Sequence, residues 1–239
     1  IIKDQMGRDV TMPDQIEKSV VLFHQALDVV TQLNATSQVA GVLVDWDKRL
    51  GKGFRKIAPE FIDIAKPGEL RAVNIESLLT LDPDLVIVPH FMDPQVIKQI
   101  EDADIPVFGL AFAKLPEDQI GKQDPELADE KKAYTEGVVE AVEMLGEVYA
   151  KQDEAKALVA AMQKGRALAD ERTASIPEQY RVRIYLAASE TSTRGAGKYT
   201  GLIIEQAGGY NVASDLHGTA KVSLEQVLAW NPEVIIVED

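Results

Sequence analysis

The sequence contains no cysteine, which excludes disulfide bonds, thiolate metal sites and a cysteine nucleophile. Long apolar runs are also missing, because none approaches the ~20 residues that cross a bilayer. Cations are scarce relative to anions: 25 Lys and Arg stand against 39 Asp and Glu, for a formal net charge of -14. This excess of acidic residues argues against nucleic-acid binding, which needs clustered Lys and Arg, and disfavours adhesion to an anionic membrane.

Signatures of catalysis are missing as well. The chain has no G-x-S-x-G elbow, no H-E-x-x-H pair and no intact G-x-G-x-x-G after a strand. GAGKYTG at 195–201 fails as a phosphate loop twice, because Ser192 holds the first glycine position and Tyr199 follows Lys198. Its glycines predict either free backbone N–H groups for an anion or a flexible turn. The sequence therefore predicts a protein that is not an enzyme.

One short unit occurs twice in the chain. VNIESLLTLDPDLVIV at 73–88 returns as VSLEQVLAWNPEVIIV at 222–237. Each copy begins with a helix-capping residue, Asn74 or Ser223, and ends after a proline in a branched apolar run. LVIV and VIIV lack polar alternation, which predicts strands buried on both faces. The wide separation of the copies indicates two similar lobes and not a short-period array.

The rest of the chain alternates predicted strands with predicted helices, as in α/β proteins. A small hairpin is expected around Gly7, then strands at 20–23, 39–44 and 106–110, a basic loop-like stretch at 45–72, a strand at 181–188 and a helix at 199–208. Residues 124–176 have helical periodicity, with a bend or interruption expected near Gly146 and KQDE at 151–154. The predicted domains are an N-terminal lobe at 1–123, a helical linker at 124–176 and a C-terminal lobe at 177–239.

These motifs together resemble a known family. The motif D-x-x-G-R-x-V-T-x-P at residues 4–13, the repeated unit, the helical linker and IIEQAGGYNVA at 203–213 are similar to the class III binding proteins of ABC importers, which carry ferric siderophores, haem and cobalamin. The resemblance implies two doubly wound parallel-sheet α/β lobes joined by a long rigid helix, with the ligand in a cleft between the lobes. It also implies a helix, a strand and a helix beyond the position of Asp239, so the C-terminal lobe is expected to be incomplete.

The function that follows from the resemblance is extracytoplasmic capture of a metal chelate, a ferric siderophore above all, and its delivery to an ABC permease dimer. We expect a monomer without a cofactor of its own, in the periplasm or as a cell-surface lipoprotein. The chain begins at Ile1 without a methionine or an apolar signal segment, which predicts a processed export sequence or a trimmed chain, and a lipid anchor would precede Ile1. The alternatives are a chelatase-like enzyme on a similar fold and a carrier of free Zn or Mn.

Candidate ligand residues follow from the rule that ligands bind beyond the carboxyl ends of parallel strands. They are His24, Gln25, Trp46, Arg49, Arg55, His90, Phe91, Phe112 and Lys114 in the first lobe and Ser189, Thr191, Arg194 and Tyr199 in the second. Aromatic surface with fixed cations suits a large organic ligand that carries anionic oxygens. The basic residues within 45–72 are equally explained as a solvated loop. Trp46 and Phe112 are equally explained as packing residues.

The histidines and two glutamates raise separate questions. A bare metal site needs three or four converging ligands, and only three histidines are present, so no direct metal site is predicted. His24, His90 or Tyr199 could serve as an axial ligand of haem. The simpler interpretation is that the histidines lie at strand ends with their hydrogen bonds satisfied. Glu76 and Glu225 hold equivalent places in the repeats, where an acid also suits the helix dipole. The resemblance implies that both contact basic pockets of the permease.

Overall fold

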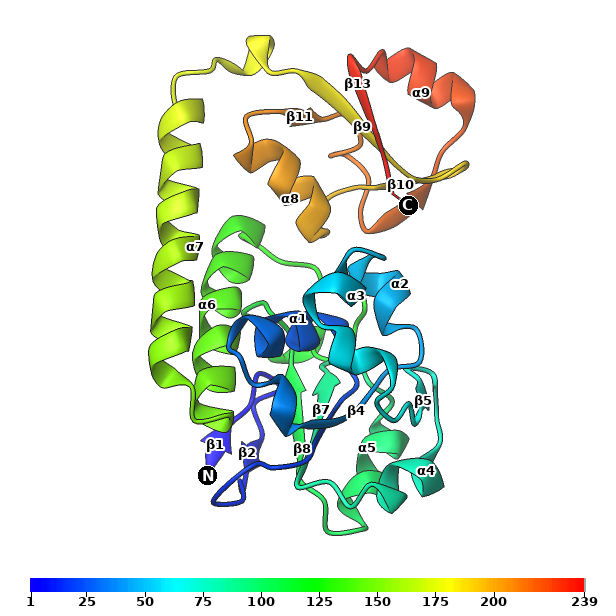
Figure 1. Cartoon of the computed structure of the whole chain (residues 1–239). Helices are drawn as coiled ribbons and strands as arrows, with labels where there is room; N and C mark the ends of the chain where they lie inside the picture. Colours follow the sequence, from blue (N-terminus) through cyan, green and yellow to red (C-terminus); the bar gives the residue numbers. More distant parts are fainter. Residues whose placement is uncertain (239) are drawn as a thin grey trace. The chain divides into compact units, whose positions relative to one another are not determined.

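The computed structural model describes residues 1–238, which form two compact α/β units. Unit 1 comprises residues 1–123 and 135–160, and unit 2 comprises residues 124–134 and 161–239. Each unit contains a sheet with flanking helices (Figure 1), which confirms the predicted fold class. No helix within residues 1–238 combines the length and the apolar character that a membrane crossing needs.

The central sheet of unit 1 has four parallel strands in the order β4-β3-β7-β8. These strands are β3 (Ser19–Val21), β4 (Val39–Val42), β7 (Leu85–Pro89) and β8 (Val107–Leu110). Residues Leu85–Val88 are fully buried, as expected for an unbroken apolar strand between two layers. The first strand, β3, has β4 on one side and β7 on the other, so the direction of winding reverses between β3 and β7.

Short helices connect these strands. They are α1 (His24–Gln32), α2 (Trp46–Leu50), α3 (Phe54–Ile57), α4 (Ile75–Thr80) and α5 (Pro94–Glu101), with 3-10 turns at Thr36–Gln38, Pro59–Ile62 and Glu117–Gln119. The loop predicted for 45–72 is therefore wrong, because α2, α3 and a small ribbon of β5 (Gly68–Glu69) with β6 (Ala72–Val73) occupy it. Trp46, Phe54 and Phe61 pack together there and hold the short helices in place, although charged side chains surround them in the sequence.

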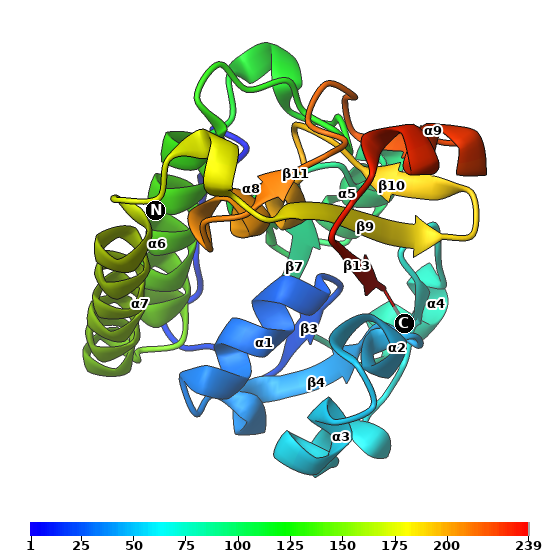
Figure 2. The ribbon, with the colours of Figure 1, turned by 90° about the horizontal axis from the view of Figure 1, so that it is seen from above.

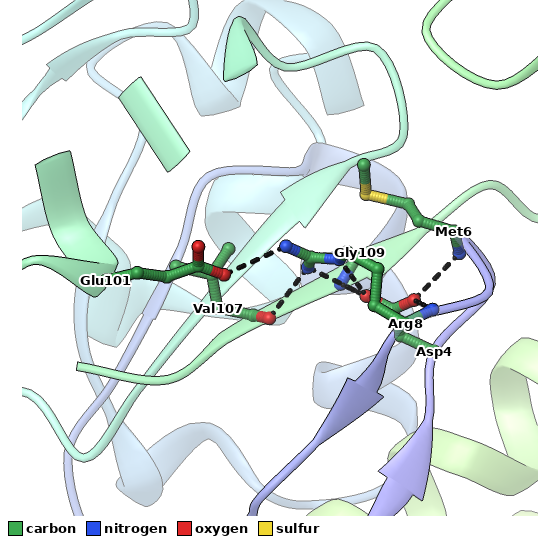
Figure 3. Close-up of polar contacts among 6 residues, drawn as sticks. All are labelled: Asp4, Met6, Arg8, Glu101, Val107 and Gly109. Carbon is green, nitrogen blue, oxygen red and sulfur yellow. Dashed lines mark hydrogen bonds and ion pairs between the residues drawn. The ribbon is translucent and has the colours of Figure 1, made fainter. Parts of the chain in front are cut away.

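The predicted N-terminal hairpin is present as β1 (Ile2–Lys3) antiparallel to β2 (Asp9–Val10), with Gly7 at φ 79° in the turn. Figure 3 shows how one carboxylate attaches this hairpin to β8. Asp4 accepts hydrogen bonds from three backbone N–H groups, those of Met6, Arg8 and Gly109, at 2.9 to 3.0 Å. The Arg8 guanidinium also donates to the Asp4 carboxylate, to the Val107 carbonyl and to Glu101. The hairpin is thus fixed to the sheet by charge-assisted hydrogen bonds.

The predicted helical region contains two helices, so the interruption expected near Gly146 and residues 151–154 is confirmed. α6 (Glu130–Val148) and α7 (Gln152–Thr173) are separated by residues 149–151, where Ala150 has a φ of 54°. Gly146 lies so close to the next helix that an added Cβ would meet the Cβ of Ala155 at 2.5 Å. Glycine at position 146 therefore allows the two helices to run side by side where they meet in unit 1 (Figures 1 and 2).

The sheet of unit 2 is built around one long strand, β9 (Arg183–Ser189). β11 (Tyr210–Asn211) and β13 (Val234–Val237) pair with β9 in parallel (Figure 2), whereas β10 (Ser192–Arg194) and β12 (Thr219–Lys221) form antiparallel pairings. The helices are α8 (Tyr199–Gln206) and α9 (Leu224–Trp230), with a 3-10 turn at Glu178–Tyr180. The sheet is therefore mixed, because the polar stretch after β9 turns back as a hairpin instead of remaining a loop.

The two repeat copies adopt the same structure in their own units. Asn74 and Ser223 cap α4 and α9 by accepting hydrogen bonds from the N–H groups of Ser77 and Gln226. The copies then enter β7 and β13, each parallel to the first strand of its sheet. The prediction that VIIV is buried on both faces is wrong for the described structure, since Val234–Val237 are 41 to 72% exposed. The strand pairs only with β9, and no described residue covers its faces as the core covers β7.

Candidate functional site

The candidate site in unit 1 lies at the carboxyl ends of β3 and β7. In open parallel sheets the crevice for ligands forms where the direction of winding reverses, and that point falls between these two strands. His24 follows β3 as the first residue of α1, and His90 follows β7 directly. His24 therefore lies on the first turn of α1. The topology brings both predicted histidines to the expected crevice.

An aromatic cluster connects the two histidines. The Phe23 ring makes edge-on contacts with the rings of His24, Phe91 and Phe112, with centroids 5.7, 6.3 and 5.5 Å apart. The His90 ring contacts Phe91 in the same way at 5.1 Å. Phe23, His90 and Phe112 are buried, whereas His24 and Phe91 are partly exposed. Phe23 was not among the candidates, because it lies within the predicted strand 20–23 and resembles a core residue.

Both histidines are neutral at physiological pH. Burial lowers the pKa of His24 to about 4, and the nearby Arg49 cation adds to this effect while Asp45 opposes it. Burial alone lowers the pKa of His90 to about 4. Its Nδ1 atom is buried without a hydrogen-bond partner in the described structure. A neutral imidazole has one N–H donor and one acceptor nitrogen, so each ring can offer a donor without adding net charge.

Arg49, one of the cations singled out in the sequence, acts electrostatically on His24. Its Nε donates to Asp45 Oδ2 at 2.9 Å, and Nη2 lies 2.9 Å from the same oxygen. Arg55 instead pairs with Asp47 at 3.3 Å and is half exposed. Asp45 was not among the predicted residues, although its spacing of four residues before Arg49 on one helical turn is a usable signal.

Trp46 lies in the core and not on the surface of the site. It is 2% exposed, and its ring contacts Phe54 and Phe61 at 5.8 to 6.1 Å. Phe112 is also buried, at 7% exposure, next to Phe23. For these two residues the structure supports the packing interpretation. The broad aromatic floor that a large organic ligand would need is therefore not formed by Trp46 and Phe112.

Gln5 fixes the backbone at the end of β8. Its Oε1 accepts hydrogen bonds from the N–H groups of Ala111 and Phe112, both at 2.9 Å, and its Nε2 donates to the Gly137 carbonyl and to Glu140. Phe112 has a φ of 54°, which is rare for a bulky residue and is often found at functional sites. Glu140 also binds the Lys114 ammonium, which is thereby engaged within the unit.

Among the predicted residues of unit 2, Ser189 ends β9, Thr191 lies in the turn to β10, Arg194 ends β10 and Tyr199 begins α8. The Arg194 guanidinium binds Glu238, which follows β13, and donates to the Thr219 hydroxyl at 2.6 Å. Tyr199 is 45% exposed at the first position of α8, and its ring contacts that of Tyr134 at 5.4 Å. Both side chains are held by neighbours in their own unit.

The glycines of GAGKYTG do not leave N–H groups free for an anion. The N–H groups of Gly195, Ala196 and Gly197 donate to the Gly218 carbonyl, the Leu216 carbonyl and the Glu130 carboxylate. The expectation of an anion cradle is therefore wrong, whereas the flexible turn stays a prediction. Gly195 is required by close approach, since an added Cβ would lie 2.0 Å from the Leu216 carbonyl oxygen.

The two repeat glutamates have matching local structure. Glu76 lies in the first turn of α4 in unit 1, and Glu225 lies in the first turn of α9 in unit 2; both are exposed. Hydrogen bonds from its own backbone N–H and from Ser223 lower the pKa of Glu225. Within residues 1–238, no three of the His, Asp and Glu side chains gather closely enough to hold a metal ion.

Comparison with known proteins gives consistent similarities. A family described as periplasmic binding protein matches residues 16–239. The chain is 46% identical over 240 residues to the molybdate-binding protein MolA of Haemophilus influenzae, covering all of this chain and 68% of that protein. A solved structure of MolA bound to molybdate has a TM-score of 0.95, with 99% of this chain and 73% of that chain covered. A cobalamin-binding protein of Halobacterium salinarum is 26% identical, and the chain spans 58% of its length.

Proposed function

The chain belongs to the periplasmic binding protein family, and from this premise we propose that it captures a small tetrahedral oxyanion, of which molybdate is the first candidate. As a member of that family it is an extracytoplasmic substrate-binding protein of an ABC importer. The family is one of transport proteins, and no reaction is proposed for the chain. The ferric siderophore predicted from the sequence gives way here to a smaller ligand.

The observation that carries this proposal is the burial of the aromatic residues near the site. Trp46, Phe112 and Phe23 are 2, 7 and 3% exposed, so their faces contact other side chains of unit 1. A haem, a corrinoid or an aromatic siderophore would need open aromatic or aliphatic surface, because such sites cover most of a large ligand with apolar groups. A compact anion needs only a few converging hydrogen-bond donors.

Donors of that kind gather at the switch point of unit 1. Neutral His24 and His90 each offer a ring N–H, and Arg49 supplies a fixed cation close to His24. The first N–H groups of α1 have no carbonyl one turn earlier in the helix, and the helix dipole favours an anion there. Neutral and charged donors fixed in one place suit an anion with several equivalent oxygens.

The relative with 46% identity supports the same ligand class, since its name and its solved complex both refer to molybdate. The cobalamin-binding relative is the reason to keep a chelate as the competing outcome. Equilibrium binding measurements on the purified protein separate the two. We expect sodium molybdate to raise the unfolding temperature and to give a saturable calorimetric signal, because a ligand that binds only the native state stabilises it.

The comparison panel is sulfate, phosphate, haemin, cyanocobalamin and a ferric siderophore. Saturable binding of one of the chelates, with no response to molybdate, would overturn the oxyanion proposal. His90→Gln serves as a site variant, since it replaces the imidazole by a side chain of similar length. We expect it to weaken molybdate binding about tenfold, as for the loss of one good hydrogen bond to an anion.

We also propose that Glu76 and Glu225 contact the permease dimer, one from each unit. Both are exposed acids on helices that begin with a side-chain cap, and they occupy the same place in the two repeat copies. Each exposed ion pair would be worth only about 0.2 to 1 kcal/mol, which suits a contact that must be released in every transport cycle.

A further inference from the structure

Asp45 and Arg49 form an ion pair with an uneven geometry beside the proposed oxyanion site. Two nitrogens of Arg49, Nε and Nη2, lie 2.9 Å from a single oxygen, Asp45 Oδ2. The other oxygen, Oδ1, is buried without a hydrogen-bond partner in the described structure. A matched pair would use both oxygens for two parallel bonds. The pair is thus not arranged for maximal mutual stabilisation.

The position of the pair explains what this geometry achieves. Asp45 is the residue before α2, and Arg49 lies on that five-residue helix with its side chain 36% exposed. The contact with Oδ2 engages one edge of the guanidinium and leaves Nη1 without a partner among residues 1–238. α2 packs against α1, which begins at His24, and both Arg49 and Asp45 act on His24 electrostatically.

We propose that Asp45 is a positioning residue for the ligand: it holds the Arg49 guanidinium at the His24 side of the site and leaves Nη1 free to donate to an anion. This inference deepens the proposed function and rests on it for the identity of the ligand. An unsatisfied buried oxygen costs stability. That cost is offset functionally if a flexible, exposed arginine is ordered before the ligand arrives, because less side-chain freedom is then lost on binding.

Simple electrostatics predicts the opposite effect of removing Asp45 on anion binding. Asp45 carries a negative charge near the bound dianion, so its removal alone should tighten molybdate binding by about tenfold at a separation of about 6 Å in water. If Asp45 positions Arg49, the same removal releases the guanidinium and weakens binding. The sign of the change therefore distinguishes the two effects.

The experiment measures molybdate binding by calorimetry for three variants. We expect Asp45→Ala to weaken binding about fivefold, and Asp45→Asn, which removes the charge but keeps a carbonyl oxygen for Arg49, to bind as tightly as the parent chain or more tightly. Asp47→Ala is the matched control, because it removes the same charge from the same short helix but releases Arg55 instead of Arg49. We expect this control to bind as tightly as the parent or slightly more tightly.

A second measurement needs no ligand. The NMR titration of the His24 ring, assigned with His24→Gln, reports whether Arg49 stays in place. With Arg49 still fixed, loss of Asp45 would lower the pKa of His24 further, because only the repulsive cation would remain. With Arg49 released, the pKa of His24 should not fall and should move back towards its ordinary value.

These outcomes separate the inference from the proposed function. Tighter molybdate binding by Asp45→Ala, or a lower pKa of His24 in that variant, overturns the positioning role. If the parent chain binds no molybdate, the ligand proposal fails, while the histidine titration still decides whether Asp45 positions Arg49.

Discussion

Replacing Asp4 by alanine should destabilise unit 1 strongly, because this carboxylate fixes the N-terminal hairpin to β8 (Figure 3). The Asp4 side chain is fully buried, and it accepts five hydrogen bonds, three from backbone N–H groups and two from Arg8. Removal leaves the Gly109 N–H buried without its acceptor and leaves the Arg8 guanidinium without its main partner.

The expected magnitude follows from these contacts. Removing one partner of a buried ion pair costs about 3 to 5 kcal/mol, because the remaining charge and donors stay desolvated. Arg8 is 29% exposed and keeps its contacts with Glu101 and the Val107 carbonyl, so the lower part of that range applies. We therefore expect a loss of about 3 kcal/mol in the free energy of unfolding, or a fall of about 6 to 12 °C in the unfolding temperature.

Urea unfolding followed by far-ultraviolet circular dichroism measures this loss. Asp9→Ala is the matched control, since Asp9 lies on the same hairpin and its pair with Lys3 is exposed, with the two charged atoms 3.9 Å apart. We expect the control to stay within about 0.5 kcal/mol of the parent. An Asp4→Ala loss below about 1 kcal/mol would refute the argument that the buried carboxylate anchors the hairpin.

Three further predictions concern transport, pH and packing. Glu76→Ala combined with Glu225→Ala should leave ligand affinity unchanged and slow uptake in a reconstituted importer; normal uptake would contradict the docking proposal. The two site histidines have folded pKa values of about 4 against an ordinary 6.5, so between these values the unfolded state binds more protons. The contribution of the histidines to the free energy of unfolding should be complete above pH 6.5 and should be lost as the pH falls towards about 4, by about 1.4 kcal/mol per pH unit for each histidine. Urea unfolding across this pH range should show a smaller dependence of stability on pH for His90→Gln. An equal dependence would refute the lowered pKa of His90. Gly195→Ala should destabilise unit 2, since its Cβ would meet the Leu216 carbonyl oxygen at 2.0 Å, whereas Gly165→Ala, open to solvent in α7, should be neutral or stabilising in a thermal melt.

The regular parts of the fold could be predicted because local signals and packing agree there. Asn74 and Ser223 are strong capping residues, and both accept the expected backbone hydrogen bonds. LVIV in the first copy is buried between layers, as its composition suggests. The same composition in VIIV does not guarantee burial, because burial depends on which neighbours cover the strand and not on the strand itself.

The candidate site could be predicted only in part. The strand-end rule selected His24 and His90, because a parallel sheet gathers the carboxyl ends of its strands at one edge. It did not separate surface from core, so Trp46 was selected although it is buried. Asp45 was missed although its spacing from Arg49 is a local signal. Gln5 was missed because it accepts hydrogen bonds from the N–H groups of Ala111 and Phe112, tertiary contacts that leave no local pattern.

Gln5 connects the hairpin to the far end of β8, where Phe112 belongs to the aromatic cluster around Phe23. The hairpin therefore supports the backbone of a residue that packs beside the candidate site. A bulky fusion partner attached beside Gln5, or cleavage within the hairpin, should shift the Phe112 backbone and thereby alter ligand affinity even where the rest of unit 1 still folds.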